Sequence, residues 1–315
     1  MDEMNNPSAS LWAANRAVWS QYYPVPVPCP DSVAVVVKLC SHEDGFVYAE
    51  CVTPRGRYFI SRDENIAADL FSFRRETHQA IVQETDLFFL LGVGLGYRLR
   101  AAWETMEASQ KGHVVVVEQS FSLLDAACRV CDLRDLFGSS RCEWIVGDDF
   151  DHEARGRIQK QSWFGARNCR FYWGYQVAEK GGQPPYDAWA DALTRFMAEE
   201  RKRFLQRWPE WVQRKKQSAS RRHRIAVIYE SHADPANEKM PAFPELLKTA
   251  DAEVVSISIP AQGYISQTYL MQRILDTDPD ELAWWGLPMG KWMPPEAAAS
   301  LPIPSRMIDS QRVSS

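Results

Sequence analysis

Two kinds of apolar pattern alternate along the middle of this 315-residue chain. Leu87–Leu91, His113–Val117 and Trp144–Val146 are short, continuous apolar runs, as expected of strands that are buried on both faces. Tyr97–Glu107 and Ser122–Arg129 lie between these runs and repeat their apolar positions at helical spacing. This alternation of strands and helices predicts a parallel sheet with right-handed crossovers.

The chain before this segment follows a different pattern. Leu11–Tyr23 has helical spacing, and the alternating prolines from Pro24 to Pro30 predict an extended connector. Three β-rich runs then predict a small antiparallel sheet, followed by a helix; the runs are 33–40, 46–53 and 57–61, and the helix is 65–83. Residues 1–85 are therefore expected to form an N-terminal extension and a small β-rich region.

A long amphipathic helix is predicted over Asp187–Val212, and Pro209 is expected to kink or divide it. This helix closes a first Rossmann-like, methyltransferase-like domain at 86–213. The basic and polar segment Arg214–Arg224 has no apolar anchor. We interpret it as a linker between domains rather than as a binding site for an anionic partner.

A second α/β unit is predicted over residues 225–315. The expected strands are 225–229, 252–259, 280–285 and 305–309, and the expected helices are 240–250, 266–275 and 295–300. The sequence thus predicts an α/β protein with two Rossmann-like units built on parallel sheets, preceded by a small β-rich N-terminal region. The second unit is shorter than a free-standing doubly wound domain and is expected to be partial.

The composition is that of an ordinary globular protein, with 45% hydrophobic and 24% charged residues and a formal net charge of −5. The acidic balance argues against a nucleic-acid partner. No apolar run approaches the roughly 20 residues of a membrane span, and no secretory signal is visible. The seven cysteines are odd in number and scattered, unlike a disulfide framework. We therefore expect a cytoplasmic protein without a transmembrane segment.

Most motifs with a defined chemistry are missing. The six histidines lie far apart, so no metal is expected. Cys128 and Cys131 have C-x-x-C spacing but fall late in a predicted helix, which favours buried, inert thiols over a redox pair. The aromatic run Phe171–Tyr175 is interpreted as strand core rather than as a surface on which a ring stacks.

One glycine-rich turn is the exception. Gly92, Gly94 and Gly96 lie between a buried strand and a helix, where glycine permits a tight turn and lets a ligand approach the backbone. The pattern G-x-G-x-G differs from the dinucleotide fingerprint G-x-G-x-x-G and is closer to the turn of S-adenosylmethionine-dependent methyltransferases. Glu118 ends the next strand, where a carboxylate accepts hydrogen bonds from a ribose.

The third strand ends in acids placed for an adenine contact, so a ligand site is predicted at this edge of the sheet, with these residues: Gly92, Gly94, Gly96, Tyr97, Glu118, Asp148 and Asp149. We expect Gly94 and Gly96 to line a concavity that faces Glu118 and Asp148. A strand-end acid is usually solvated without its ligand, so folding is expected to survive Glu118→Ala. The alternative is that the glycines only let helix and strand pack closely and that the site is empty.

The order of several segments resembles a known family. These segments are Gly56–Ser61, Phe88–Tyr97, Val114–Glu118 and Ile145–Asp148. They resemble the Rossmann-like domain of bacterial protein glycosyltransferases of the motility-accessory-factor type. They also resemble the N-terminal module of long proteins similar to the spore-maturation protein CgeB, in which a GT-B glycosyltransferase follows.

Residues 225–309 resemble the first half of such a GT-B unit, chiefly through Ile274–Asp280 and Ile303–Asp309. The resemblance implies a glycosyltransferase-related protein that acts in glycosylation of bacterial surface or flagellar proteins. A nucleotide sugar would be its cofactor, and a protein or glycan acceptor its partner. Two departures stand out. Ser61 lacks the Asp-Pro pair that usually follows it, and the chain stops where the nucleotide-sugar-binding half would begin, so we expect it to be incomplete or noncatalytic by itself.

Two other functions stay open. A methyltransferase would use Gly92–Gly96, Glu118 and Asp148 around S-adenosylmethionine, although no catalytic motif follows the third or fourth strand. A noncatalytic binding or assembly module is favoured by the short second unit. The sequence singles out no catalytic residue, and it leaves open the donor sugar or cofactor, the acceptor and the oligomeric state.

Overall fold

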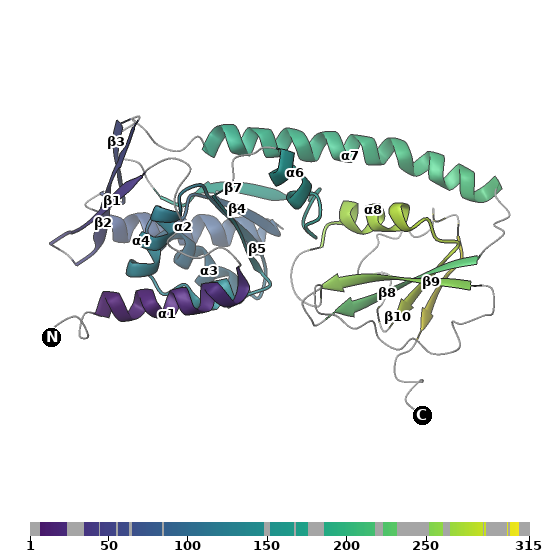
Figure 1. Cartoon of the computed structure of the whole chain (residues 1–315), viewed down its shortest axis with the longest axis horizontal. Coiled ribbons are helices and arrows are strands. Elements are labelled where there is room, and N and C mark those ends of the chain that lie inside the picture. The colour runs from purple at the N-terminus through teal and green to yellow at the C-terminus, as the bar shows by residue number, and fades with distance from the viewer. Residues whose placement is uncertain are drawn as a thin grey trace, which may run out of the picture. The chain divides into compact units, whose positions relative to one another are not determined.

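The computed structural model describes residues 7–23, 35–43, 45–54, 56–62, 65–83, 85–147, 152–166, 168–175, 186–217, 223–231, 252–260, 265–285, 287, 301 and 303–308. The chain divides into two compact units (Figure 1): unit 1 comprises Met1–Gly156 and Asn168–Leu193, and unit 2 comprises Arg157–Arg167 and Thr194–Ser315. Each unit contains a parallel sheet, and unit 1 also contains a small antiparallel sheet. The predicted fold class is therefore confirmed.

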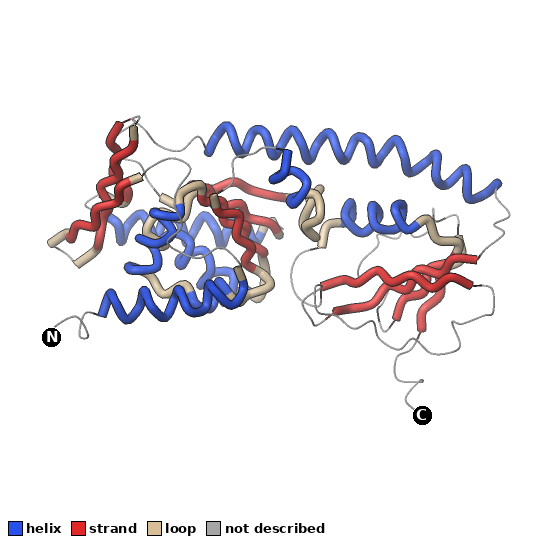
Figure 2. The backbone as a smooth tube through the Cα atoms, in the orientation of Figure 1, coloured by secondary structure: helices blue, strands red, loops and turns tan. Residues whose placement is uncertain are grey.

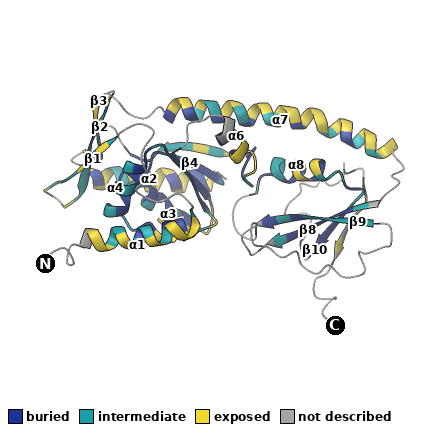
Figure 3. Ribbon diagram, in the orientation of Figure 1, coloured by how far each residue is buried: buried dark blue, intermediate teal, exposed yellow. Residues whose placement is uncertain are grey.

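The parallel sheet of unit 1 has four strands: β4 (Leu87–Leu91), β5 (His113–Glu118), β6 (Cys142–Val146) and β7 (Cys169–Trp173). Their order across the sheet is β6-β5-β4-β7, and all pairs are parallel. Every residue of β4 and β5 is buried (Figure 3). The strand order reverses between β4 and β7, and open sheets place ligands at the carboxyl ends of such a pair.

Helices pack around this sheet: α2 (Ile66–Val82), α3 (Tyr97–Ser109), α4 (Phe121–Val130) and α5 (Arg134–Phe137). Ser120 is the N-cap residue of α4, and its side chain accepts a hydrogen bond from the Leu123 N–H. A further helix, α6 (His152–Ile158), follows the sheet's third strand. The sequence did not predict α5 or α6. Both helices are short, with four and seven residues, which is fewer than two and a half turns.

The N-terminal residues belong to unit 1. Strands β1 (Val36–Ser41), β2 (Val47–Thr53) and β3 (Gly56–Ile60) form the predicted antiparallel sheet in the order β1-β2-β3 (Figure 2). Helix α1 (Pro7–Tyr22) packs on α4 and α5. Its Trp19 is 2% exposed and contacts Phe137 and Trp144 edge-on, so the extension completes the core of this unit.

Unit 2 is built on strands β8 (His223–Ser231), β9 (Ala252–Pro260), β10 (Glu281–Trp285) and β11 (Ser305–Ile308). They are parallel, in the order β11-β10-β8-β9. Helix α8 (Gln267–Thr277) and the second half of α7 (Tyr186–Gln217) contribute to the core on one face of this sheet. The predicted helices 240–250 and 295–300 lie outside the described residues.

Helix α7 corrects two expectations. It continues through Pro209, so the predicted division there is wrong. A proline removes one N–H donor, but Phe204 and Trp211 on either side of it are buried in the unit 2 core and hold the helix together. The helix also includes residues 214–217 of the predicted linker 214–224.

The basic end of α7 is anchored by acids of unit 2. Lys215 is 10% exposed, and its Nζ lies 2.8 Å from Asp280 Oδ1 and 3.3 Å from Asp278 Oδ1. The Trp211 indole also donates to Asp278 (2.6 Å). Residues 214–217 of the predicted linker are thus helical, and among them Lys215 alone is not exposed. Residues 218–222 lie outside the described residues, and His223 already belongs to β8. Whether the two units behave as separate domains stays a prediction.

Candidate functional site

The glycine turn joins β4 to α3 through three left-handed residues. The φ angles are 78° at Gly92, 56° at Gly94 and 86° at Gly96, a region that side chains disfavour. The Gly92 N–H donates to the Val117 carbonyl of β5 (2.7 Å), and the Gly96 N–H donates to the Val93 carbonyl (2.9 Å). The turn therefore has the backbone conformation for which glycine was expected.

Two tyrosines cover this turn. A Cβ atom at Gly94 would lie 2.8 Å from the Tyr175 side chain, and one at Gly92 would lie 3.0 Å from the Tyr186 ring. The Gly174 N–H donates to the Leu91 carbonyl (3.0 Å), so the chain that leaves β7 runs directly over the turn. The place where a ligand was expected to meet the backbone is occupied by the protein's own side chains.

Glu118 is bonded to the same cover. The residue has 0% exposure. Its Oε2 accepts a hydrogen bond from the Val93 N–H (2.8 Å), and its Oε1 accepts from the Ser120 N–H (2.9 Å) and from the Tyr186 hydroxyl (2.7 Å). The expectation of a solvated carboxylate is wrong, because three donors from the turn, the β5–α4 connection and α7 converge on it.

The cover is a buried cluster of phenols. Tyr175 and Tyr186 are 2% and 0% exposed, and their rings meet nearly at right angles. Burial, followed by the neighbouring Glu118, raises the pKa of both hydroxyls well above the usual tyrosine value. Both groups are therefore protonated, and Tyr186 acts as a donor. The neighbouring Tyr186 partly offsets the rise in the pKa of the Tyr175 hydroxyl. Among the described residues, the buried Tyr175 hydroxyl has no hydrogen-bond partner.

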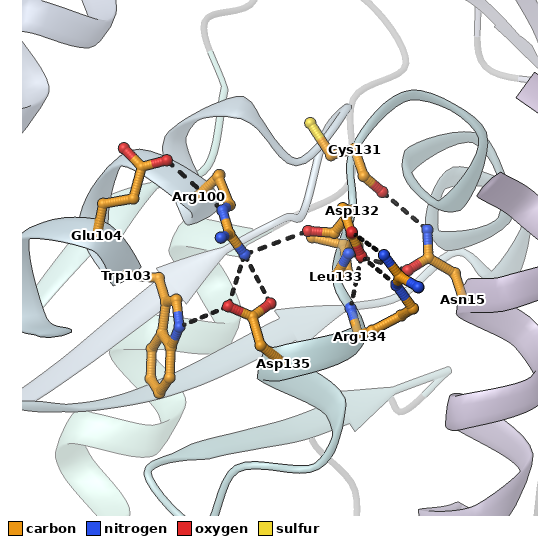
Figure 4. Close-up of polar contacts among 9 residues, drawn as sticks. All are labelled: Asn15, Arg100, Trp103, Glu104, Cys131, Asp132, Leu133, Arg134 and Asp135. Atoms are coloured by element: carbon orange, nitrogen blue, oxygen red, sulfur yellow. Dashed lines mark hydrogen bonds and ion pairs between the residues drawn. The ribbon is translucent and has the colours of Figure 1, made fainter. Parts of the chain in front are cut away.

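Gly96 allows a close contact with a different residue, Cys131. A Cβ atom there would lie 2.9 Å from the Cβ of Cys131. Cys131 is held in place by Asn15 of α1, whose amide donates to the Cys131 carbonyl (2.8 Å) and accepts from the Leu133 N–H (2.9 Å) (Figure 4). The predicted concavity lined by Gly94 and Gly96 is thus filled on one side by Tyr175 and on the other by Cys131.

The C-x-x-C pair lies in this packed region. Burial raises the pKa of the Cys128 thiol to about 12 and that of the Cys131 thiol to about 12. Thiols with such pKa values are protonated and poorly nucleophilic near neutral pH. This is the behaviour expected of inert thiols.

Tyr97, the first residue of α3, is bonded to the small antiparallel sheet. Its hydroxyl accepts a hydrogen bond from the Val47 N–H of β2 (3.0 Å). Together with Arg98 it lines a shallow hollow with room for about one water molecule, whose wall includes Ser61, Asp69, Gly174 and Tyr175. The hollow lies beside the ends of β4 and β7, where the strand order reverses.

The structure thus brings Gly92, Gly94 and Glu118 together but closes them off, and it places Tyr97 on another surface. Asp148 and Asp149 lie outside the described residues. Ligand binding by the predicted residues stays a prediction. Sequence reasoning assigned Tyr175 to the strand core, and the residue is indeed buried, but it lies past the end of β7 and packs on the glycine turn. Tyr186 was missed. Within the described ranges, no cluster of His, Cys, Asp and Glu side chains is arranged to hold a metal ion.

No helix in the described part of the chain is long and apolar enough to cross a membrane.

No protein-family profile matches the chain, and no curated protein matches it. Among solved structures, a MAf glycosyltransferase from Magnetospirillum magneticum AMB-1 is similar to 96% of this chain, with 16% sequence identity and a TM-score of 0.41. The match covers 54% of that protein, so the chain spans about half of its length. A likeness of this strength carries no conclusion about activity.

Proposed function

We propose that this chain is a glycosyltransferase-related protein in which unit 1 is a noncatalytic module. The relation is supported by the sequence segments that resemble the motility-accessory-factor type. In the structure these segments are β3, β4 with its glycine turn, β5 and the end of β6. Glu118 ends β5, and the glycine turn after β4 donates to it through the Val93 N–H.

The closure of the glycine turn carries the noncatalytic part of the proposal. A nucleoside bound there would have to displace the rings of Tyr175 and Tyr186, and buried aromatic rings each cover roughly 150–250 Å². It would also have to replace the hydrogen bond between Tyr186 and Glu118. The protein itself thus supplies two groups that a nucleoside would otherwise supply: an aromatic ring over the glycine turn, and a hydroxyl that donates a hydrogen bond to the Glu118 carboxylate.

The same observation weighs against a methyltransferase. Such an enzyme would present the Glu118 carboxylate to the ribose of S-adenosylmethionine, whereas both oxygens of Glu118 accept hydrogen bonds from the protein. Unit 2 is proposed to be related to the first half of a GT-B unit. A nucleotide sugar, and a protein or glycan acceptor in the glycosylation of bacterial surface or flagellar proteins, belong to the proposal through this relation.

Calorimetric titration tests the proposal. The wild-type chain is titrated with S-adenosylmethionine, S-adenosylhomocysteine and nucleotide sugars, in parallel with Tyr186→Phe and with the control Tyr22→Phe, whose ring is 56% exposed. If Glu118 were a ligand site, removing the competing hydroxyl should strengthen binding several-fold in Tyr186→Phe alone. We expect no binding at this site, so any heat observed should be the same in all three proteins.

Two results would overturn the proposal. One is saturable binding of S-adenosylmethionine to the wild type. The other is binding of any nucleotide that changes with Tyr186→Phe and not with Tyr22→Phe. Binding of a nucleotide sugar that is indifferent to both substitutions would place its site elsewhere in the chain and agree with the proposal.

A further inference from the structure

Helix α2 of unit 1 has apolar side chains on two sides. The inner side is buried through these residues: Ile66, Phe73, Thr77, Ala80 and Ile81. The outer side carries Phe71 and Val82, which are 71% and 68% exposed. Single exposed apolar side chains are ordinary, but among the described helices α2 alone has two large ones. The packing of unit 1 does not account for this outer side.

The two exposed residues belong to one stripe along the helix, which we call the α2 stripe. It consists of five exposed residues at intervals of three, four, three and four: Ala68, Phe71, Arg75, His78 and Val82. Side chains at such intervals lie on one face of a helix. The same repeat forms the seam along which two helices pack. The α2 stripe is about 21 Å long, which is long enough for a second helix to lie along it.

The centre of the α2 stripe is basic. Arg75 and His78 lie between its two large apolar residues, and neither has a hydrogen bond or an ion pair with any other described residue. The neighbouring Arg74, which is not part of the stripe, is neutralised by Glu104 of α3 at 2.8 Å. The stripe itself contains no acidic residue. A partner that carries carboxylates between two apolar residues would therefore match the stripe in both charge and shape.

We propose that the α2 stripe docks an acidic amphipathic helix of a partner protein. The apolar residues of that helix pack on Phe71 and Val82, and its carboxylates pair with Arg75 and His78. A membrane surface is a poorer match, because an interfacial helix buries a broad apolar face in lipid and the broad apolar face of α2 is already buried in the protein. A second copy is also a poorer match. A two-fold contact would place the basic centre of one stripe against that of the other.

Fluorescence anisotropy on the full chain at low salt tests this proposal with two labelled synthetic peptides. Both peptides are about three heptads long and have leucine at the a and d positions. One carries glutamate at the flanking e and g positions, and the other carries lysine there. We expect the acidic peptide to bind saturably, with a dissociation constant in the micromolar range, and the basic peptide to bind at least about fivefold more weakly. Added salt should weaken the binding of the acidic peptide.

Three variants separate docking on the α2 stripe from general stickiness of the surface. Phe71→Ser removes the larger apolar contact and should weaken binding of the acidic peptide at least about tenfold, with little change in melting temperature because the ring is exposed. Leu205→Ser is the matched control, because Leu205 is also apolar and 56% exposed but lies on α7. It should bind like the wild type. Arg75→Glu reverses the charge, so it should weaken binding of the acidic peptide and strengthen binding of the basic one.

The proposal fails if the acidic peptide does not bind saturably, if Phe71→Ser binds it like the wild type, or if Arg75→Glu leaves the preference unchanged. Two further measurements address the other occupants. Cosedimentation with vesicles of phosphatidylglycerol and phosphatidylcholine that is lost in Phe71→Ser would overturn the proposal in favour of a membrane. A dimer in sedimentation velocity that is lost in Phe71→Ser would overturn it in favour of a second copy. The calorimetric test with Tyr186→Phe concerns other residues, so the two proposals stand or fall separately.

Discussion

The glycine turn of unit 1 and the basic end of α7 in unit 2 have opposite chemistry but share one property. In both, a distant segment of the chain supplies part of the bonding partners: Tyr186 for Glu118, and Arg214 and Lys215 for Asp278. Glu118 is fully buried and is held by two backbone N–H groups and a phenol. Asp278, 42% exposed, is held by the charged side chains of Arg214 and Lys215.

The two regions differ in how much stability is lost when their polar contacts are removed. Buried N–H groups that lose their acceptor cannot turn to water, so the loss of Glu118 is expensive. Exposed ion pairs exchange one partner for solvent and are screened by salt. The turn should therefore behave as core, and the exposed Arg214–Asp278 pair at the end of α7 as an adjustable surface contact.

Removing the buried carboxylate should have the largest effect. Glu118→Ala leaves the Val93 and Ser120 N–H groups without their acceptor, and we expect the free energy of unfolding to fall by at least about 3 kcal/mol. Urea denaturation measures it. Glu104→Ala, at a half-exposed surface ion pair, is the control and should change stability by less than about 1 kcal/mol. A loss for Glu118→Ala no greater than the control's would mean that the carboxylate is solvated and the turn open.

Filling the turn should be the next most damaging change. Gly94→Ala adds a methyl group against Tyr175, whereas Gly45→Ala, also at a left-handed φ (87°), meets no atom within 4 Å. Both substitutions carry the conformational cost of about 1–2 kcal/mol. Gly94→Ala should cost roughly 1–3 kcal/mol more through overpacking. Equal losses in thermal or urea unfolding would show that Tyr175 does not rest on the turn.

Deleting only the phenolic oxygen should have a smaller effect. Tyr186→Phe removes the hydrogen bond to Glu118 and should lower the free energy of unfolding by about 1–2 kcal/mol. The raised pKa of this hydroxyl also predicts a pH dependence. The protonated form is favoured by folding, so its contribution is complete below the ordinary tyrosine pKa of about 10 and is lost as the pH rises above it. The free energy of unfolding, measured from neutral to alkaline pH, should therefore decrease less steeply with pH in Tyr186→Phe than in the wild type. Identical slopes would contradict the buried position of the hydroxyl.

The exposed ion pair at the end of α7 should give the smallest effect. Arg214→Gln removes the contact with Asp278, in which the two side chains are 62% and 42% exposed, and should lower the free energy of unfolding by less than about 1 kcal/mol at low salt. The difference from the wild type should shrink in concentrated salt. Lys215→Gln is the contrast, because the side chains of Lys215 and Asp280 are only 10% and 16% exposed, and its larger loss should depend less on salt. An Arg214→Gln effect as large as that of Lys215→Gln and independent of salt would contradict this distinction.

The elements were predictable from the sequence because their signals are local. The continuous apolar runs became β4 and β5 with every residue buried, and the three β-rich runs before them became the antiparallel sheet. The predicted proline connector lies outside the described residues. Periodicity even located α8 and β10 in the shorter unit. Such patterns report which residues are buried, and burial follows from the residue types themselves.

The site was not predictable for the same reason. Tyr186, whose hydroxyl donates to Glu118, lies 68 residues further along the chain, and nothing near Glu118 indicates that a tyrosine will fill the place of a ligand. The glycine pattern correctly required left-handed backbone at Gly94 but could not say whether a ligand or Tyr175 rests on it. Lys215 looked unanchored because Asp280, its acceptor, lies 65 residues away.

Helix α1 has a consequence for how the protein is made. Its Asn15 bonds to the backbone of Cys128 and Leu133, 113 and 118 residues later in the chain. A ribosome adds about 5–20 residues each second, so this helix leaves the exit tunnel roughly 6–24 seconds before its docking surface exists. Trp12 and Trp19 remain uncovered throughout that interval. During synthesis the chain therefore exposes an aromatic helix before the residues that cover it have been made.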